Sequence, residues 1–339
     1  MLKGSECRQS ADKGTEAMQT NMDAIRVAVI GVGYLGKFHA QKYAAMEGVQ
    51  LVGVVDIDAA RAEEVAADFG TRPFTDYRDL LDSVDAVSIV VPTETHYTVG
   101  LDFLKHDKDV LIEKPMTSTL EQADALINLA DSRTRILQIG HLERFNPAVL
   151  ALKEIVEHPM FIESHRLSTF KDRCTDVSVV LDLMIHDIDI IMNVVNSDIK
   201  SIHAAGAPVI CKHADIANVR LQFENGCVAN VTASRISTKN QRKIRLFQKD
   251  AYISVDFSGR EIVIIRRNEN HSDGLVPGLD IQQLSFSDAD VLEDELVSFI
   301  KAVRFRKPPL VSGRSGRQAL AVAIRIMDEI DAAIQRYLI

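Results

Sequence analysis

Residues 25–36 read IRVAVIGVGYLG, a short apolar run that leads directly into three glycines spaced as G-x-G-x-x-G. This spacing gains weight when a strand precedes it and a helix follows, which is the pattern here. Gly31 permits the tight turn, Gly33 lets the backbone approach a pyrophosphate, and Gly36 allows the helix to pack closely on the sheet. The anion would then face the helix N-terminus. The segment therefore predicts a dinucleotide-binding β-α-β unit.

An acidic residue follows at the distance expected for ribose recognition. Asp56 ends the next apolar run, twenty residues after Gly36, where a carboxylate can accept both hydrogen bonds of the adenosine ribose diol. A 2'-phosphate about 4 Å away would be repelled by about 4 kcal/mol per unit charge pair at an effective dielectric constant near 20, unless Arg61 offset it. The sequence thus favours NAD over NADP. Asp56 could also cap the next helix, a role it would share with Asp58.

Apolar runs alternate with amphipathic stretches of helical length as far as residue 146. This rhythm is typical of β-α-β units around a parallel sheet. Strands are predicted at residues 26–30, 50–56, near 74, 85–91, 109–113 and 135–140. Helices are predicted between them at residues 35–46, 59–69, 77–81, 95–106 and 120–132. Residues 23–146 are therefore predicted to form a Rossmann domain with a doubly wound parallel sheet.

The pattern changes after Pro147. A helix at 148–157, a strand at 161–170 and a helix at 179–195 precede a succession of strands. A hairpin is predicted around Asn225-Gly226, between strands at 217–223 and 227–233, because Asn-Gly suits a tight turn. Further elements are strands at 243–248, 252–257 and 261–266, a loop with Gly274, Pro277 and Gly278, and a helix near 289–304. Residues 147–313 are predicted to form an α+β domain with a large, mainly antiparallel open sheet, followed by a C-terminal helix at 314–339.

Length and composition narrow the functional classes. The chain has 339 residues, more than one hydrophobic core usually serves, which favours two domains. A formal net charge of -9 disfavours nonspecific nucleic-acid binding. The cationic cluster at Lys239, Arg242, Lys243 and Arg245 is more simply interpreted as a charged sheet edge. No stretch approaches the roughly 18 uninterrupted apolar residues of a membrane helix.

The ends and cysteines of the chain suggest its compartment. The four cysteines are widely spaced, with no C-x-x-C, and the N-terminus lacks an apolar signal-peptide core. A reduced cytoplasmic location is therefore predicted. Residues 1–22 are polar and are predicted to be a disordered tail.

Three residues are candidates for proton transfer. Lys114 follows a predicted strand at the edge where ligands of open α/β sheets bind, and Pro115 favours an extended backbone there. Asp182 and His186 stand four residues apart, so a helix would place them on one face. The carboxylate could orient the imidazole as a general base. Lys114 is the alternative base, and a buried structural Asp–His pair is the alternative to catalysis. No zinc-type spacing of cysteines and histidines is present, so no metal is predicted.

Together these segments resemble the Gfo/Idh/MocA oxidoreductases. The resemblance spans residue 25 to the final helix and rests on GVGYLG with His39 after it, VVPTETH at 90–96, EKP at 113–115, RFNP at 144–147 and DLMIH at 182–186. It implies an NAD(P)-binding domain and a second domain whose open sheet forms a homo-oligomer, either a dimer or a tetramer. It also implies hydride transfer at a sugar or polyol carbinol, with Lys114, Asp182 and His186 near the reacting carbon.

The resemblance also assigns residues around each ligand. Besides the glycines and Asp56, cofactor contacts are expected at Tyr34, Leu35, Ile57, Thr93, His96, Glu113 and Lys114. The segment from His141 to Asn146 would line the nicotinamide side. Substrate contacts are expected at Lys114, Arg144, Phe145, Asn146, Asp182 and His186.

The string from Arg166 to Asp189 is similar to a bacterial branch of this family that oxidises the 3-position of UDP-N-acetylglucosamine for lipid A or surface-polysaccharide synthesis. Arg166 and Arg173 are candidate donors to the diphosphate, because guanidinium groups suit phosphate oxygens. The ketone would pass to a pathway aminotransferase. Two alternatives remain: a dehydrogenase of a free polyol or aldose of the inositol type, and a noncatalytic NAD-binding sensor, which needs no proton-transfer residues.

Overall fold

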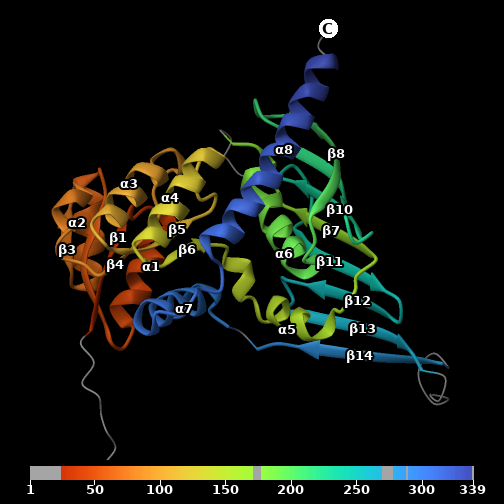
Figure 1. The fold of residues 1–339 in the computed structure, drawn as a ribbon, viewed down its shortest axis with the longest axis horizontal. Helices are drawn as coiled ribbons and strands as arrows, with labels where there is room; N and C mark the ends of the chain where they lie inside the picture. The colour runs from red at the N-terminus through yellow and green to blue at the C-terminus, as the bar shows by residue number, and fades with distance from the viewer. Residues whose placement is uncertain (1–23, 171–176, 269–277, 288, 338–339) are drawn as a thin grey trace, which may run out of the picture.

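The computed structural model describes residues 24–170, 177–268, 278–287 and 289–337. They form two domains that lie side by side (Figure 1). The predicted tail at residues 1–22 and the candidate Arg173 lie outside the described residues. None of the described helices is long and apolar enough to cross a membrane.

The N-terminal domain is built on a six-stranded sheet in which all neighbouring strands are parallel. The strands are β1 (Ile25–Ile30), β2 (Val49–Val55), β3 (Arg72–Phe74), β4 (Ala86–Ile89), β5 (Asp109–Glu113) and β6 (Leu137–Gly140). The helices are α1 (Tyr34–Ala45), α2 (Ala59–Phe69), α3 (Thr93–Lys105) and α4 (Leu120–Ser132), with 3-10 turns η1 (Tyr77–Leu80) and η2 (Leu142–Phe145). The order β3-β2-β1-β4-β5-β6 is that of a doubly wound dinucleotide fold, so the Rossmann prediction is confirmed.

Burial on both faces explains why these strands read as continuous apolar runs. In β1, Val27 and Val29 belong to one hydrophobic core, whereas Ala28 and Ile30 belong to the other. Successive side chains of a strand point to opposite faces, and helices cover both faces of a parallel sheet.

Helix α7 (Val291–Phe305) packs on the N-terminal domain although it is far from it in sequence. Leu296, Phe299 and Val303 share a hydrophobic core with Val27 and Val29 of β1. The predicted second domain, extending to residue 313, therefore includes a helix that packs on the first. Its amphipathic pattern could not reveal which domain its apolar face would meet.

The C-terminal domain contains an eight-stranded sheet in the order β14-β13-β12-β11-β7-β10-β9-β8. Its strands are β7 (Phe161–Leu167), β8 (Ile199–Ala207), β9 (Ile216–Phe223), β10 (Val228–Ser234), β11 (Gln241–Gln248), β12 (Ala251–Asp256), β13 (Glu261–Arg267) and β14 (Leu279–Ser285). Only β7 and β10 pair in parallel; the other neighbours are antiparallel, as predicted. The hairpin of β9 and β10 turns at Gly226, whose φ is 88°. The sequence prediction missed β8 and β14, which are the two edge strands and carry the weakest alternation of buried residues.

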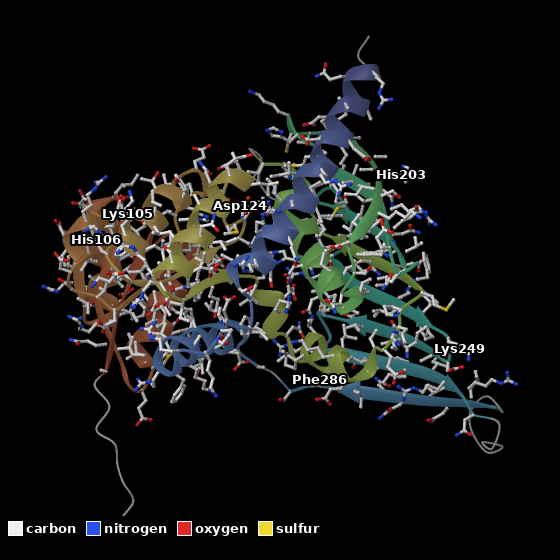
Figure 2. All side chains as sticks on the ribbon, viewed as in Figure 1. Lys105, His106, Asp124, His203, Lys249 and Phe286 are labelled. Atoms are coloured by element: carbon white, nitrogen blue, oxygen red, sulfur yellow. The ribbon has the colours of Figure 1, made fainter. Side chains whose placement is uncertain are left out.

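Three helices lie on one face of this sheet, α5 (Pro147–Ile155), α6 (Ile185–Val195) and α8 (Gly313–Tyr337), and no described helix lies on the other (Figure 1). A π-helical turn, η3 (Val180–Met184), leads into α6. Helix α8 joins the domains: Arg317 donates hydrogen bonds of 2.7 and 2.9 Å to Asp124 of α4 (labelled in Figure 2), and Ala323 and Ile330 belong to the core beneath the second sheet.

Candidate functional site

A cleft of about 700 Å³ lies at the carboxyl ends of β1, β2 and β4. Its lining includes Gly31, Gly33, Asp56, Ile57 and Thr95. The strand order reverses between β1 and β4, and ligands of open α/β sheets bind at such a switch point. The fold therefore places the glycine loop and the predicted ribose carboxylate around one cavity.

The glycine loop has the shape that a dinucleotide requires. Gly31 has a φ of 87°, and a Cβ on Gly36 would lie 1.9 Å from the carbonyl oxygen of Gly31, so both positions exclude a side chain. A Cβ on Gly33 would meet no protein atom within 4 Å, but Gly33 lines the cleft and precedes α1 without a side-chain cap. The backbone N–H groups at this helix end are thus open to an anion. These residues fit the pyrophosphate of NAD.

Asp56 supports the glycine loop and retains capacity for a ribose. Its Oδ2 accepts a hydrogen bond of 3.1 Å from the N–H of Val32, and its Oδ1 accepts one of 3.0 Å from the N–H of Asp58. Asp58, rather than Asp56, caps α2. A carboxylate can accept about four hydrogen bonds, so two sites remain for the diol. The nearest cation is Arg61, whose Nη1 lies 3.8 Å from Oδ2.

We expect Asp56→Ser to raise the binding preference for NADPH over NADH by about 100-fold. The change removes hydrogen bonds to a charged group, which contribute about 1.5–3 kcal/mol, and leaves Arg61 free to meet a 2'-phosphate. Fluorescence titration with each reduced cofactor measures both dissociation constants. The neighbouring Asp58→Asn, which keeps a capping side chain, should leave the preference unchanged. An equal effect of both substitutions would argue against ribose recognition by Asp56.

Other expected cofactor residues differ in accessibility. Tyr34 and Ile57 are 77% and 96% exposed, and Leu35 and Thr93 are half-buried. His96 is buried and its two ring nitrogens lie 2.9 and 2.8 Å from the carbonyl oxygens of Pro115 and Val91. It therefore ties α3 to the segment after β5. Glu113 is buried as well, with Oε1 3.4 Å from Nε2 of the buried His39.

Lys114 meets the 182–186 segment at the junction of the domains. Its Nζ donates a hydrogen bond of 2.9 Å to the backbone carbonyl of Asp182. The Lys114–Pro115 peptide is cis. Asp182 lies in the π-helical turn η3, and single π turns occur frequently at functional sites. The fold thus brings together catalytic candidates that are distant in sequence.

The predicted orientation of His186 by Asp182 is wrong for this structure. Nδ1 of His186 is buried and has no hydrogen-bond partner among the described residues. The expectation assumed α-helical periodicity, whereas residues 180–184 form a π turn, in which positions four apart are rotated differently. His186 instead packs edge to face on His141, with ring centroids 6.5 Å apart.

The surroundings of His186 favour its neutral form. Burial lowers the pKa of His186 well below its ordinary value of 6.5, and the positive charges of Lys114 and Arg166 act in the same direction. A neutral imidazole can accept a proton, so His186 is in the state that a general base needs. For Nε2 to be the acceptor, Nδ1 must carry the ring hydrogen.

Acidification is expected to destabilise the protein from about pH 6.5 downward. Burial lowers the pKa values of His96, His141 and His186, so below 6.5 the unfolded chain binds protons that the folded protein does not. Each histidine then removes up to about 1.4 kcal/mol of unfolding free energy per pH unit, until its lowered pKa is reached. Urea unfolding over this range measures the slope.

A pair of variants tests the origin of that slope. His141→Asn should make the pH dependence shallower, because one buried neutral imidazole is removed. His203→Asn, at an exposed position of β8 (labelled in Figure 2), should leave it unchanged. Equal slopes in both variants would contradict the role of burial.

Arg166, predicted to bind a diphosphate, is instead held inside the protein. It is 3% exposed and donates hydrogen bonds of 2.8 and 3.1 Å to the two carboxylate oxygens of Asp187 and one of 2.8 Å to Glu143. Burial opposes its charge, but these carboxylates outweigh burial and raise the pKa of Arg166. With its guanidinium occupied in this way, Arg166 is not open to a phosphate, and that prediction is wrong.

The side chains of Arg144, Phe145 and Asn146 in the RFNP segment are also buried inside the protein. Arg144 is 5% exposed and pairs with Asp189 at 3.3 Å and with Oδ1 of Asn193 at 2.7 Å. Phe145 lies in the core of the N-terminal domain, and the side chain of Asn146 caps α5. These three residues, predicted to contact the substrate, instead hold in place the segment that connects the two domains. Sequence reasoning could not see this, because the partners come from α6.

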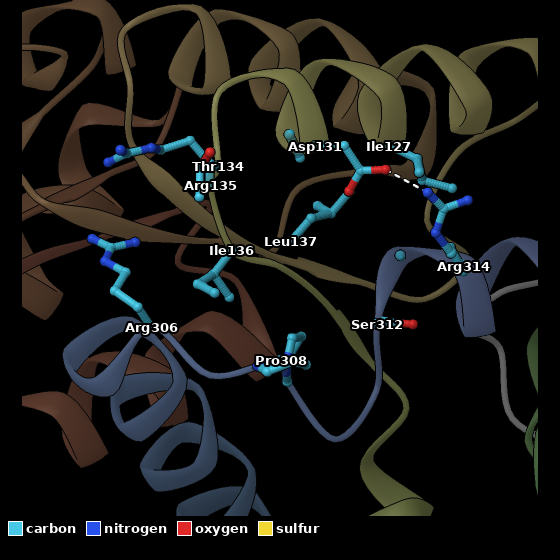
Figure 3. Close-up of a pocket in the computed structure, with 13 residues that line it drawn as sticks. Ile127, Asp131, Thr134, Arg135, Ile136, Leu137, Arg306, Pro308, Ser312 and Arg314 are labelled. Atoms are coloured by element: carbon cyan, nitrogen blue, oxygen red, sulfur yellow. Dashed lines mark hydrogen bonds and ion pairs between the residues drawn. The ribbon is translucent and has the colours of Figure 1, made fainter.

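A second cavity, of about 340 Å³, lies apart from this site (Figure 3). It is bounded by the end of α4, the start of β6 and the segment from Arg306 to Arg314, and Asp131 pairs with Arg314 at its rim. Because β6 begins here, the cavity lies at the opposite sheet edge from the cofactor cleft, and the two share no lining residue. Among the described residues, no group of three or more His, Cys, Asp or Glu is arranged as a metal site.

Comparisons with known proteins cover both domains. Residues 25–141 match an oxidoreductase family with an NAD-binding Rossmann fold, and residues 157–254 match the GFO/IDH/MocA C-terminal domain. The chain is 40% identical to a UDP-N-acetylglucosamine 3-dehydrogenase of Acidithiobacillus ferrooxidans over 92% of this chain and 99% of the relative. The solved structure of that enzyme matches with a TM-score of 0.87 at 39% identity, covering 92% and 99% of the two chains.

Two relatives of lower identity are inositol dehydrogenases. The scyllo-inositol 2-dehydrogenase (NAD(+)) of Bacillus subtilis is 28% identical over 88% of this chain and 92% of its own. The myo-inositol 2-dehydrogenase of Thermotoga maritima is 27% identical over 87% and 93%.

Proposed function

The chain belongs to the Gfo/Idh/MocA family of NAD-dependent oxidoreductases acting on CH–OH groups, and on that basis we propose that it oxidises the 3-hydroxyl of UDP-N-acetylglucosamine to a ketone. The observation that carries this proposal is the 40% identity with an enzyme of that activity over 99% of its length. The meeting of Lys114 with the segment of Asp182 and His186 supports catalysis rather than a noncatalytic sensor. We propose with it a role in lipid A or surface-polysaccharide synthesis.

The side chains at the junction suit the chemistry. When bound, NAD accepts the hydride from the carbinol carbon. We assign His186 as acceptor of the hydroxyl proton, because it lies one turn after the Asp182 carbonyl that holds Lys114 and burial favours its neutral form. Lys114, held by the carbonyl of Asp182, would stabilise the developing alkoxide through its ammonium group.

The substrate is tested by NADH absorbance with purified protein, NAD or NADP, and a panel of UDP-N-acetylglucosamine, its uronic acid, free hexoses and inositols. Each reaction contains a ketone trap or an aminotransferase, because an unfavourable equilibrium could hide turnover. NADH formation with UDP-sugars alone supports the proposal. Turnover of free polyols alone would favour the inositol-type alternative. The inositol dehydrogenases among the relatives support that alternative. Tight NAD binding without turnover of any substrate would favour the sensor.

Two partner proposals accompany this function. A pyridoxal-phosphate aminotransferase would consume the 3-keto product in the cytoplasm. A homo-oligomer would form through the helix-free face of the second sheet, where Phe161, Phe247 and Tyr252 stack with ring centroids 5.6 and 5.2 Å apart. Light scattering of the parent and of Phe247→Glu tests the assembly: a lower mass for the variant supports it, and a monomeric parent overturns it.

A further inference from the structure

We propose that Arg242 on β11 is the cation that recognises the diphosphate of a nucleotide-sugar substrate, an inference that rests on the proposed function. The sequence alone had placed Arg242 in a charged sheet edge, but β11 is an inner strand between β12 and β7. The charged residues of this strand therefore divide between the two faces of the sheet. Their roles follow from the face on which each one lies.

Register places Arg242 on the face that carries the candidate site. Arg242 pairs directly with Arg166 of the neighbouring β7. Ile244 and Leu246, two and four residues further along β11, lie in the core beneath α6 and α8. Alternation along a strand puts Arg242 on their side and Lys243 on the helix-free side.

The two paired arginines differ in how far they are neutralised. Arg166 holds both oxygens of Asp187 and one oxygen of Glu143 in three hydrogen bonds. Arg242 shares only Glu143, with Nη1 3.6 Å from its Oε1, and its side chain is 56% exposed. Among the described residues the guanidinium of Arg242 makes this ion pair and no hydrogen bond. The guanidinium N–H groups of Arg166 are used in hydrogen bonds to carboxylates, whereas those of Arg242 remain available to a ligand.

Arg242 also belongs to the ion-pair network beside the proposed proton acceptor, because it shares Glu143 with Arg166, and Arg166 holds Asp187, the residue after His186. Burial is the main cause that lowers the pKa of His186, and the positive charges of Lys114, Arg166 and Arg242 act in the same direction. In UDP-N-acetylglucosamine the diphosphate is attached at C1, two ring positions from C3. A cation near His186 is therefore within reach of the diphosphate when C3 faces the imidazole. Guanidinium groups bind phosphate oxygens in bidentate geometry.

Steady-state kinetics of Arg242→Ala and Arg242→Gln test the inference. We expect KM for UDP-N-acetylglucosamine to rise about 10- to 100-fold in both variants while kcat changes little, because the lost contact is made equally in the ground state and the transition state. Inhibition by UDP alone should weaken by a similar factor. Arg242→Lys should recover part of the affinity, since the charge remains but the paired donors are lost.

The matched control is Lys243→Ala, which removes a cation from the opposite face of the same strand and should leave KM and UDP inhibition unchanged. A parent that oxidises the UDP-sugar, together with Arg242 variants of unchanged KM and UDP inhibition, overturns the role of Arg242 and leaves the proposed function standing. An equal rise of KM in Lys243→Ala also overturns it, because the effect would then be general charge. A parent that binds no UDP and oxidises only free polyols overturns the proposed function, and this inference with it.

Discussion

Replacing Lys114 with alanine is expected to lower kcat about 100- to 10,000-fold while the dissociation constant for NADH changes little. Nζ of Lys114 reaches across the domain junction to the carbonyl of Asp182, whereas the cleft around the glycine loop and Asp56 does not include Lys114 in its lining. Its loss should therefore affect the reacting carbon more than the adenosine half of the cofactor. Stopped-flow turnover and fluorescence titration measure the two quantities separately.

Two further substitutions provide a control for Lys114→Ala and separate the two possible roles of Lys114. Lys105→Ala, at an exposed position on α3 (labelled in Figure 2), is the matched control and should change neither quantity. Lys114→Arg keeps a positive charge but cannot act as a proton acceptor, because guanidinium does not lose its proton in proteins. Partial rescue by arginine supports alkoxide stabilisation with His186 as the base; no rescue supports Lys114 as the base. Loss of NADH affinity with an unchanged kcat would contradict both roles.

Replacing Asp187 with alanine is expected to cost about 3–5 kcal/mol of unfolding free energy. Asp187 is 1% exposed and accepts two of the three hydrogen bonds by which Arg166 is held. Its removal leaves a buried guanidinium with Glu143 as its remaining carboxylate partner. Urea unfolding of parent and variant, followed by circular dichroism, measures the difference.

An exposed pair of the same chemistry provides the control. Asp131 pairs with Arg314 at the rim of the second cavity (Figure 3), with side chains that are 55% and 72% exposed. Asp131→Ala should cost no more than about 1 kcal/mol, because water solvates both groups. If Asp187→Ala cost no more than this, water would have to reach Arg166 in the folded protein, and the buried network would not be a source of stability.

Local patterns predicted much of the fold correctly. The glycine loop, the strands of the first domain and the Asn225-Gly226 hairpin each depend on residues that are close in sequence. The two edge strands β8 and β14 escaped prediction because they lack a fully buried face. The predicted bounds of the second domain include helix α7, which packs on the first domain; its apolar stripe shows only that it packs, not against which domain.

The candidate site also has features that the sequence predicted and features that only the structure shows. Sequence placed Gly31, Gly33 and Asp56 around a cofactor and selected Lys114 and His186, and the roles of these residues remain predictions. It could not foresee the π turn at residues 180–184, which breaks the α-helical spacing on which the expected pairing of Asp182 with His186 depended.

The sequence by itself determined the alternation of strands and helices in the first domain and the phosphate-binding loop, because backbone geometry at glycines and the spacing of apolar residues act over a few positions. Only the tertiary structure decided which arginine can face a ligand. Arg166 and Arg242 are alike as residues, yet η2 and α6 supply Glu143 and Asp187 to the first and leave the second half-exposed. The free energy of a buried charge depends on the partners that the fold brings within hydrogen-bond distance, and those partners lie far away along the chain.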